Sequence, residues 1–164
     1  MKNLRLLIIA LTLVTFFSAC KKDDAPKVKT KSEMISSDSG KQWRITSMKA
    51  KYTLNGQQRE EDVMNLAFDE ACERDNLTVL FRNKTYEARE GALKCGSADL
   101  LDTGTWELKN NDTELHVTTP KAGSLYSTLK EVTETSITGE FPQTFPLTSG
   151  GTVETMVTVV YTAQ

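Results

Sequence analysis

The feature that most constrains the fold is an alternation of apolar and polar residues that begins at Gln42 and recurs almost to the end of the chain. In the closing segment TVETMVTVVYTA, the alternate residues from Val153 to Tyr161 share one face. Such alternation is typical of strands with one buried face. About eight such segments follow one another, joined by turn residues, at intervals of roughly ten residues. The pattern predicts an all-β domain, an antiparallel up-and-down eight-stranded barrel rather than a sandwich.

The first strand carries two sets of inward-facing residues that are out of step with each other. Trp43 and Ile45 define one face of QWRITSMKAKYTL, and the apolar residues from Met48 onward define a face shifted by one position. A β-bulge near residues 46–47 would turn both sets toward the interior and bend the strand strongly. Asn55-Gly56 follows, a pair that favours a two-residue hairpin turn.

Two segments interrupt the alternation. Within residues 60–73, Val63, Leu66 and Ala67 have helical spacing, which predicts one short helix or irregular excursion. Residues 142–151 (PQTFPLTSGG) combine prolines with glycines, a composition typical of a loop. The helical segment is not long enough to form a second layer by itself.

The amino terminus has the order of a secretory signal peptide. Lys2 and Arg5 precede an apolar run from Leu6 to Phe17, and two small residues follow. The run of about a dozen residues is too short to span a bilayer comfortably as a helix, so a transmembrane anchor is the weaker interpretation. We predict that residues 1–19 form a signal peptide.

Cys20 is set apart from the other cysteines by its neighbours. Phe17-Ser18-Ala19-Cys20 resembles the lipobox of bacterial lipoproteins, which implies cleavage before Cys20 and acyl chains on its thiol. Lys21-Lys22-Asp23-Asp24 resembles the export signal of Bacteroidetes surface lipoproteins, although these residues also suit the solvated start of a linker. Residues 20–40 are mostly polar and predict a flexible lipidated tether, which leaves residues 41–164 as the folded domain. The expected location is the outer membrane, with a surface-exposed orientation as a further expectation.

The two remaining cysteines, Cys72 and Cys95, flank the predicted hairpin of residues 77–90. In a secreted domain two such cysteines most simply form a disulfide, which stabilises the fold by roughly 3 kcal/mol in the chain-entropy picture. The alternative is a metal site completed by His116, but the spacing of the three residues matches no common zinc motif. His116 lies between Leu115 and Val117 and is expected on the outward side of its strand.

Several of these features together resemble a known family. They are Gly40-Lys41-Gln42-Trp43 at the first strand, Cys72 before Leu77-Thr78-Val79, Cys95, Gly104-Thr105-Trp106 and a Thr-rich closing segment. Over about residues 40–162 the chain resembles the lipocalin-like domain found in many Bacteroidetes lipoproteins. The resemblance implies an up-and-down barrel whose open end can hold a small apolar molecule.

The sequence lacks a recognisable catalytic or cofactor motif. It contains no Gly-x-Ser-x-Gly and one histidine, and the carboxylates from Asp69 to Asp75 lack the spacing of a calcium loop and indicate a solvated acidic face. Without residues 1–19 the chain keeps 18 basic and 22 acidic residues with no basic stripe, so nucleic acid is an unexpected partner. We expect a non-enzymatic monomer without metal or cofactor.

Aromatic residues are the best candidates for ligand contact. Five of them are expected to face the barrel interior, where they either bind a ligand or simply fill the core: Trp43, Tyr52, Phe81, Tyr86 and Trp106. A sixth, Phe145, lies between Pro142 and Pro146 and could act as a lid, a contact for another protein or a plug. The sequence therefore predicts a cell-envelope lipoprotein that binds a small apolar or amphipathic ligand at the barrel mouth. The alternative is a filled barrel that presents its loops to an envelope or host partner.

Overall fold

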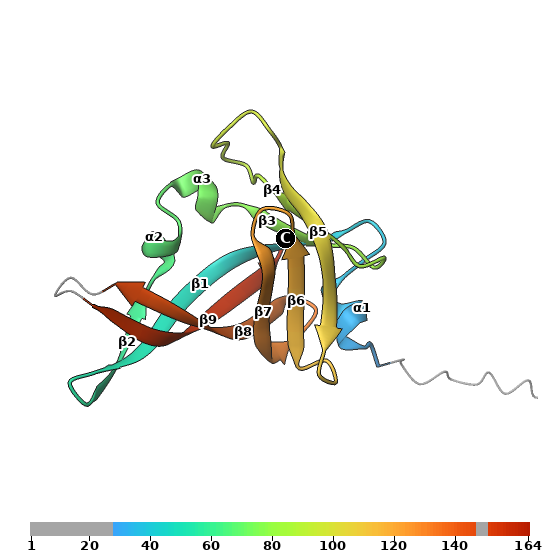
Figure 1. The fold of residues 1–164 in the computed structure, drawn as a ribbon. Helices are drawn as coiled ribbons and strands as arrows, with labels where there is room; N and C mark the ends of the chain where they lie inside the picture. The colour runs from blue at the N-terminus through green and yellow to red at the C-terminus, as the bar shows by residue number, and fades with distance from the viewer. Residues whose placement is uncertain (1–27, 147–150) are drawn as a thin grey trace, which may run out of the picture.

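A computed structural model describes residues 28–146 and 151–164 (Figure 1). The predicted signal peptide, the predicted lipidation site Cys20 and the predicted export signal at residues 21–24 lie outside the described residues. Within the described residues, no helix is long and apolar enough to cross a bilayer.

Eight antiparallel strands close a barrel, which confirms the predicted fold class. They follow one another around the barrel in chain order, and the last strand pairs with the first: β1 (Lys41–Leu54), β3 (Leu77–Leu80), β4 (Thr85–Arg89), β5 (Leu100–Lys109), β6 (Glu114–Thr119), β7 (Gly123–Val132), β8 (Ser136–Pro146) and β9 (Thr152–Ala163). A ninth strand, β2 (Gln57–Asp62), pairs only with the second half of β1 and extends beyond the barrel.

The long first strand has the predicted bulge and the predicted hairpin. The register between β1 and β9 shifts between Ile45 and Ser47, so that Trp43, Met48 and Ala50 are all buried. Asn55 and Gly56 adopt left-handed backbone conformations with φ of 52° and 78°, which suits a tight hairpin turn. Because of the bulge, apolar residues on both sides of the register shift face the interior of the barrel.

The short helix α1 (Lys31–Ile35) closes one end of the barrel, which we call the closed end. Thr30 and Glu33 form a capping box at its start. Ile35 has no exposed surface, and its carbonyl accepts a hydrogen bond from the Trp43 indole N–H at 2.9 Å. The flexible tether predicted for residues 20–40 is therefore wrong from Thr30 onward, because this segment packs into the core.

Polar contacts connect α1 and its flanking residues to all three turns at the closed end. Each turn, β3–β4, β5–β6 and β7–β8, contributes at least one partner: Lys84 Nζ to Ser32 Oγ at 2.8 Å, Arg82 to Asp38 at 3.1 Å, Lys31 Nζ to Asp112 O at 2.8 Å and Lys29 to Glu134 at 2.7 Å. Exposed pairs of this kind contribute little energy singly. Together they orient the helix over the barrel end.

At the opposite end lie two short helices, α2 (Met64–Ala67) and α3 (Ala71–Arg74), which confirm the predicted helical excursion. Cys72 of α3 forms the predicted disulfide with Cys95 in the β4–β5 loop. The buried carboxylate of Glu90 accepts hydrogen bonds from the backbone N–H groups of Cys95 and Gly96 and fixes this loop. Asp75 accepts a hydrogen bond from the Leu93 N–H at 2.8 Å, so the expected acidic face is partly used in structure.

The interior divides into two apolar clusters. The first lies toward the closed end and is built around Ile35, Trp43 and Trp106. The second, which we call the upper core, contains Met48, Ala50, Val63, Val157 and Val159, with α2 packed against it. The candidate site lies between these clusters.

Candidate functional site

A cavity of about 390 Å³ lies inside the barrel. Most of its wall is apolar and includes Trp43, Leu80, Leu115, Val117, Ile137 and Val159. Hydroxyl and amide groups add a few polar points to this wall: Thr78, Tyr86, Tyr161, Ser127 and Gln143. An apolar cavity with a few hydrogen-bonding groups is the usual form of a small-molecule site.

Two of the six predicted aromatic contact residues, Trp43 and Tyr86, line this cavity. Trp43 reaches it from the closed end, where its indole is fixed by the hydrogen bond to Ile35. Tyr86 reaches it from β4, and burial raises the pKa of its phenol. Whether either residue contacts a ligand stays a prediction.

Three others lie elsewhere in the fold. Trp106 is buried beside the cavity, donates its indole N–H to Phe81 O at 2.9 Å and lies beneath Lys84 Nζ. Phe81 follows β3 at the closed end, and its ring packs so tightly on Gly40 that a side chain there would clash. The expectation that Tyr52 faces the interior is wrong, because it lies on the β1–β2 ribbon with its hydroxyl bonded to Glu61 at 2.5 Å.

Phe145 is not on a loop. Residues 142–146 belong to β8, where Phe145 pairs with Val153 and packs against the upper core. The loop prediction is therefore wrong for this part of the segment, and residues 147–150 lie outside the described residues. The two prolines suggested a loop because they interrupt most strands, but here they occupy a strand edge, where a missing N–H is tolerated.

Sequence reasoning missed Tyr161 as a cavity residue, although it was placed on the inward face of β9. Its ring lines the cavity across from β4. Burial raises the pKa of Tyr161 to about 12, with a smaller contribution from Tyr86. The structure records no hydrogen bond from the Tyr161 hydroxyl to another described residue, so this group is available to a ligand.

The raised pKa of Tyr161 predicts a loss of stability at alkaline pH. Because the folded pKa of about 12 exceeds the ordinary value of 10.0, the stabilising effect is complete below about pH 10 and is lost as the pH rises through about 12. The loss should reach about 2–3 kcal/mol. Denaturant unfolding at about pH 9 and about pH 11.5 should show a smaller loss for Tyr161→Phe than for the wild type. Equal losses in the two proteins would contradict this assignment.

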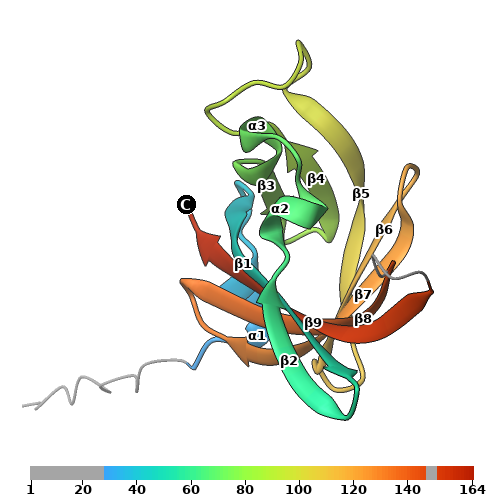
Figure 2. The same cartoon turned by 90° about the vertical axis from the view of Figure 1, so that its left-hand side faces the viewer.

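The wall of the cavity is interrupted between β7 and β8. These strands pair from Val132–Ile137 only as far as Thr128–Glu140. Beyond that point β7 pairs with β6 alone and β8 with β9 alone, and Figures 1 and 2 show the two strands diverging. Cavity-lining residues lie on both unpaired halves, at 124–127 and 141–143. We call this interruption the β7–β8 slot.

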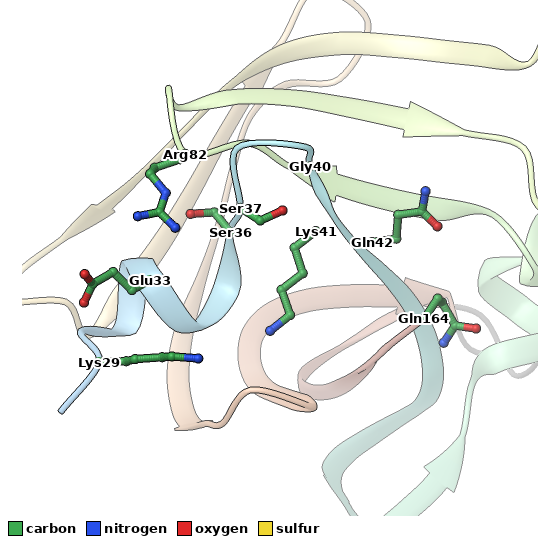
Figure 3. A pocket seen from close by; sticks show the side chains of 9 residues that line it. All are labelled: Lys29, Glu33, Ser36, Ser37, Gly40, Lys41, Gln42, Arg82 and Gln164. Atoms are coloured by element: carbon green, nitrogen blue, oxygen red, sulfur yellow. The ribbon is translucent and has the colours of Figure 1, made fainter. Parts of the chain in front are cut away.

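A second pocket, of about 490 Å³, lies at the closed end between α1 and the start of β1 (Figure 3). It is open and polar. Each of its three cations has a partner within the chain: Lys29 with Glu134, Arg82 with Asp38, and Lys41 Nζ with Met34 O at 2.5 Å. Because these charges already hold the N-terminal segment on the barrel, we assign the residues of this pocket a structural role.

His116 lies on the outer face of β6, as its position between two inward residues predicts. Its Nε2 is 2.8 Å from the Glu114 carboxylate, and its ring stacks on Tyr126. In the described part of the chain, the one group of potential metal ligands is Glu70 with Cys72 and Cys95. Because the two cysteines share a disulfide, they offer no thiolate for a metal.

Comparison with known proteins adds no assignment: no family model and no curated protein matches the chain.

Proposed function

We propose that this protein is a lipid-anchored, non-enzymatic binding module that holds one small apolar or amphipathic molecule inside the barrel. The observation that carries the proposal is the cavity of about 390 Å³. Its volume falls within the range of about 300–1,000 Å³ typical of small-molecule sites. A barrel serving only as a rigid support for loops would fill this space with side chains, so the cavity favours binding over the alternative.

The chemistry of the wall supports an amphipathic ligand. The apolar residues provide the hydrophobic contribution, which is about 25 cal/mol per Å² of apolar surface buried. Burial raises the pKa of the Tyr86 phenol and of the Tyr161 phenol. Both phenols therefore stay protonated over the physiological range, and each can donate a hydrogen bond. A ligand with one hydrogen-bond acceptor and an otherwise apolar body fits this arrangement.

The proposed anchor places the barrel close to the membrane. Only seven residues lie between Cys20 and Val28, where the described chain begins, and the eight Cα–Cα steps span at most about 29 Å. Because Lys29 pairs with Glu134 at the closed end, a lipid on Cys20 would hold this end near the bilayer. The resemblance to lipocalin-like lipoproteins of Bacteroidetes and the outer-membrane location belong to the same proposal.

Filling the cavity should abolish binding. Val117→Phe places an aromatic ring inside the cavity, and we expect at least a tenfold loss of affinity for 1-anilinonaphthalene-8-sulfonate, an amphipathic fluorescent probe. Val160→Phe, on the outward face of β9, is the matched control and should bind as the wild type does. Fluorescence titration measures both, with circular dichroism to confirm folding. A wild type that does not bind the probe, or equal binding by Val117→Phe, would overturn the proposed function.

A further inference from the structure

We infer that the ligand enters and leaves the barrel sideways, through the β7–β8 slot, and that Pro142 and Pro146 keep this slot open. The inference rests on the proposed function, because it assigns a route to the same cavity. It differs from the sequence prediction, which placed the ligand at the barrel mouth.

The backbone of β7 faces the slot with unpaired groups. The Leu129 N–H donates to Thr113 O at 2.7 Å, so every second residue from Leu129 to Leu125 bonds to β6. Hydrogen-bonding direction alternates along an antiparallel strand. The N–H and C=O groups of Tyr126 and Ser124 therefore point toward β8, where the structure records no partner strand at this level among the described residues.

The sequence of β8 explains why this edge stays unpaired. Thr128–Glu140 is the last pair between the two strands. By the same alternation, Pro142, Thr144 and Pro146 are the next β8 residues whose backbone faces β7. Proline has no N–H to donate, so two of these three positions cannot donate a hydrogen bond to β7, and a regular ladder would lose half of the bonds at each of them. The hydrogen bonds between β8 and β9 are unaffected, because they are made by the intervening residues Phe141, Gln143 and Phe145.

Side-chain exposure follows the same path. Leu125, Ser127 and Leu129 share the inward face of β7, because they lie two residues apart. Leu129 is 7% exposed, Ser127 is half-buried and Leu125 is 55% exposed. An inward-facing leucine that is more than half exposed indicates that solvent reaches the inner face of β7 at the level of the slot.

The pairing of the barrel strands is also interrupted between β1 and β3. This second interruption, which we call the seam between β1 and β3, is covered. β1 and β3 pair over only four residues, from Lys41 to Arg44 on β1. Helix α2 lies beside this seam, with Val63 and Phe68 packed on the upper core. The Cys72–Cys95 disulfide attaches the adjoining α3 to the β4–β5 loop. Since α2 covers the seam between β1 and β3, the β7–β8 slot is the uncovered interruption of the barrel wall beside the cavity in the described part of the chain.

Restoring donors to β8 tests the route. In the full chain, Pro142→Thr with Pro146→Thr should let β8 pair with β7, and hydrogen exchange at the Ser124 and Tyr126 amides should slow at least tenfold. The association and dissociation rates of 1-anilinonaphthalene-8-sulfonate, followed by stopped-flow fluorescence, should both fall at least tenfold. Because Pro142 also belongs to the cavity wall, the affinity is measured separately by equilibrium titration, and both rates should fall by a larger factor than the affinity changes. Pro120→Thr, in the β6–β7 turn, is the matched control and should alter neither rate.

The outcomes separate the route from the function. Protected amides with unchanged rates would overturn the slot as the route and leave the cavity as the site. Wild-type amides that already exchange slowly would also overturn it. If the threonine variant leaves the amides unprotected, Leu125→Cys with Gln143→Cys, joined by a bis-maleimide, closes the slot covalently and the rates decide in the same way. No probe binding to the wild type would overturn the proposed function and the route together.

Discussion

Trp43→Ala is expected to lower the free energy of unfolding by about 3–5 kcal/mol, the range for truncating a buried large aromatic side chain. Trp43 is 1% exposed and belongs to the cluster that joins β1 to α1. The substitution also removes the indole donor and leaves the buried carbonyl of Ile35 without its partner. Urea unfolding of the two proteins measures the difference.

Two further variants separate the causes of this loss. Trp43→Phe keeps most of the ring but removes the donor, and should lose only about 1–3 kcal/mol. Trp106→Ala removes an equally buried indole with an equally placed hydrogen bond, at 2.9 Å to Phe81 O, and should match Trp43→Ala in stability. Because Trp43 lines the cavity and Trp106 does not, Trp43→Ala alone should also change probe affinity. A loss below about 1 kcal/mol for Trp43→Ala would show that this cluster is not the main core.

The parts of the fold that sequence reasoning found are those that burial imposes on a strand. Alternation located the inward faces of β1 and β9, because a strand with one buried face must place apolar residues at every second position. It also located the bulge between Ile45 and Ser47, since two sets of apolar residues out of step need an extra residue between them. The Cys72–Cys95 pairing was predicted because the amino terminus suggested a secreted protein, in which two such cysteines most simply pair.

The missed elements carry no such pattern. β2 (QQREED) is exposed along its whole length and contains no apolar residue, so only its pairing with β1 defines it. α1 lies in a polar segment, and Ile35 is the one buried residue within the helix, although the Thr30–Glu33 capping box was a readable sign of a helix start. In both cases the fold depends on contacts with distant strands, and a local pattern does not contain that information.

The candidate site was predictable only in part for a related reason. Aromatic content indicates which side chains can fill a barrel, but a cavity is the space that packing leaves. Trp43 lines that space and Trp106 does not, although both are equally buried. Pro142 and Pro146 illustrate the same limit, because their composition predicted a loop where the structure uses them to leave one strand edge unpaired.

Removing residues 1–40 is expected to lower the free energy of unfolding by at least about 4 kcal/mol relative to a chain that begins at residue 28. The deletion exposes the apolar surface that Ile35 covers, and truncating a buried isoleucine costs about 2–5 kcal/mol. It also leaves the buried Trp43 indole N–H without an acceptor, at about 1–3 kcal/mol, and removes the contacts to all three closed-end turns. Since small domains are stable by about 5–15 kcal/mol, the shorter chain should be marginal.

The matched control separates this effect from the loss of a tether. A chain that begins at residue 28 lacks the predicted signal peptide and Cys20 but keeps α1, and it should unfold as the full-length chain without its signal peptide does. Ile35→Ala in that chain should lose about 2–5 kcal/mol by itself. If the chains beginning at residues 28 and 41 unfold at the same denaturant concentration, α1 rests on the barrel without contributing to it. Unequal stabilities, with Ile35→Ala between them, would place the domain boundary before Thr30.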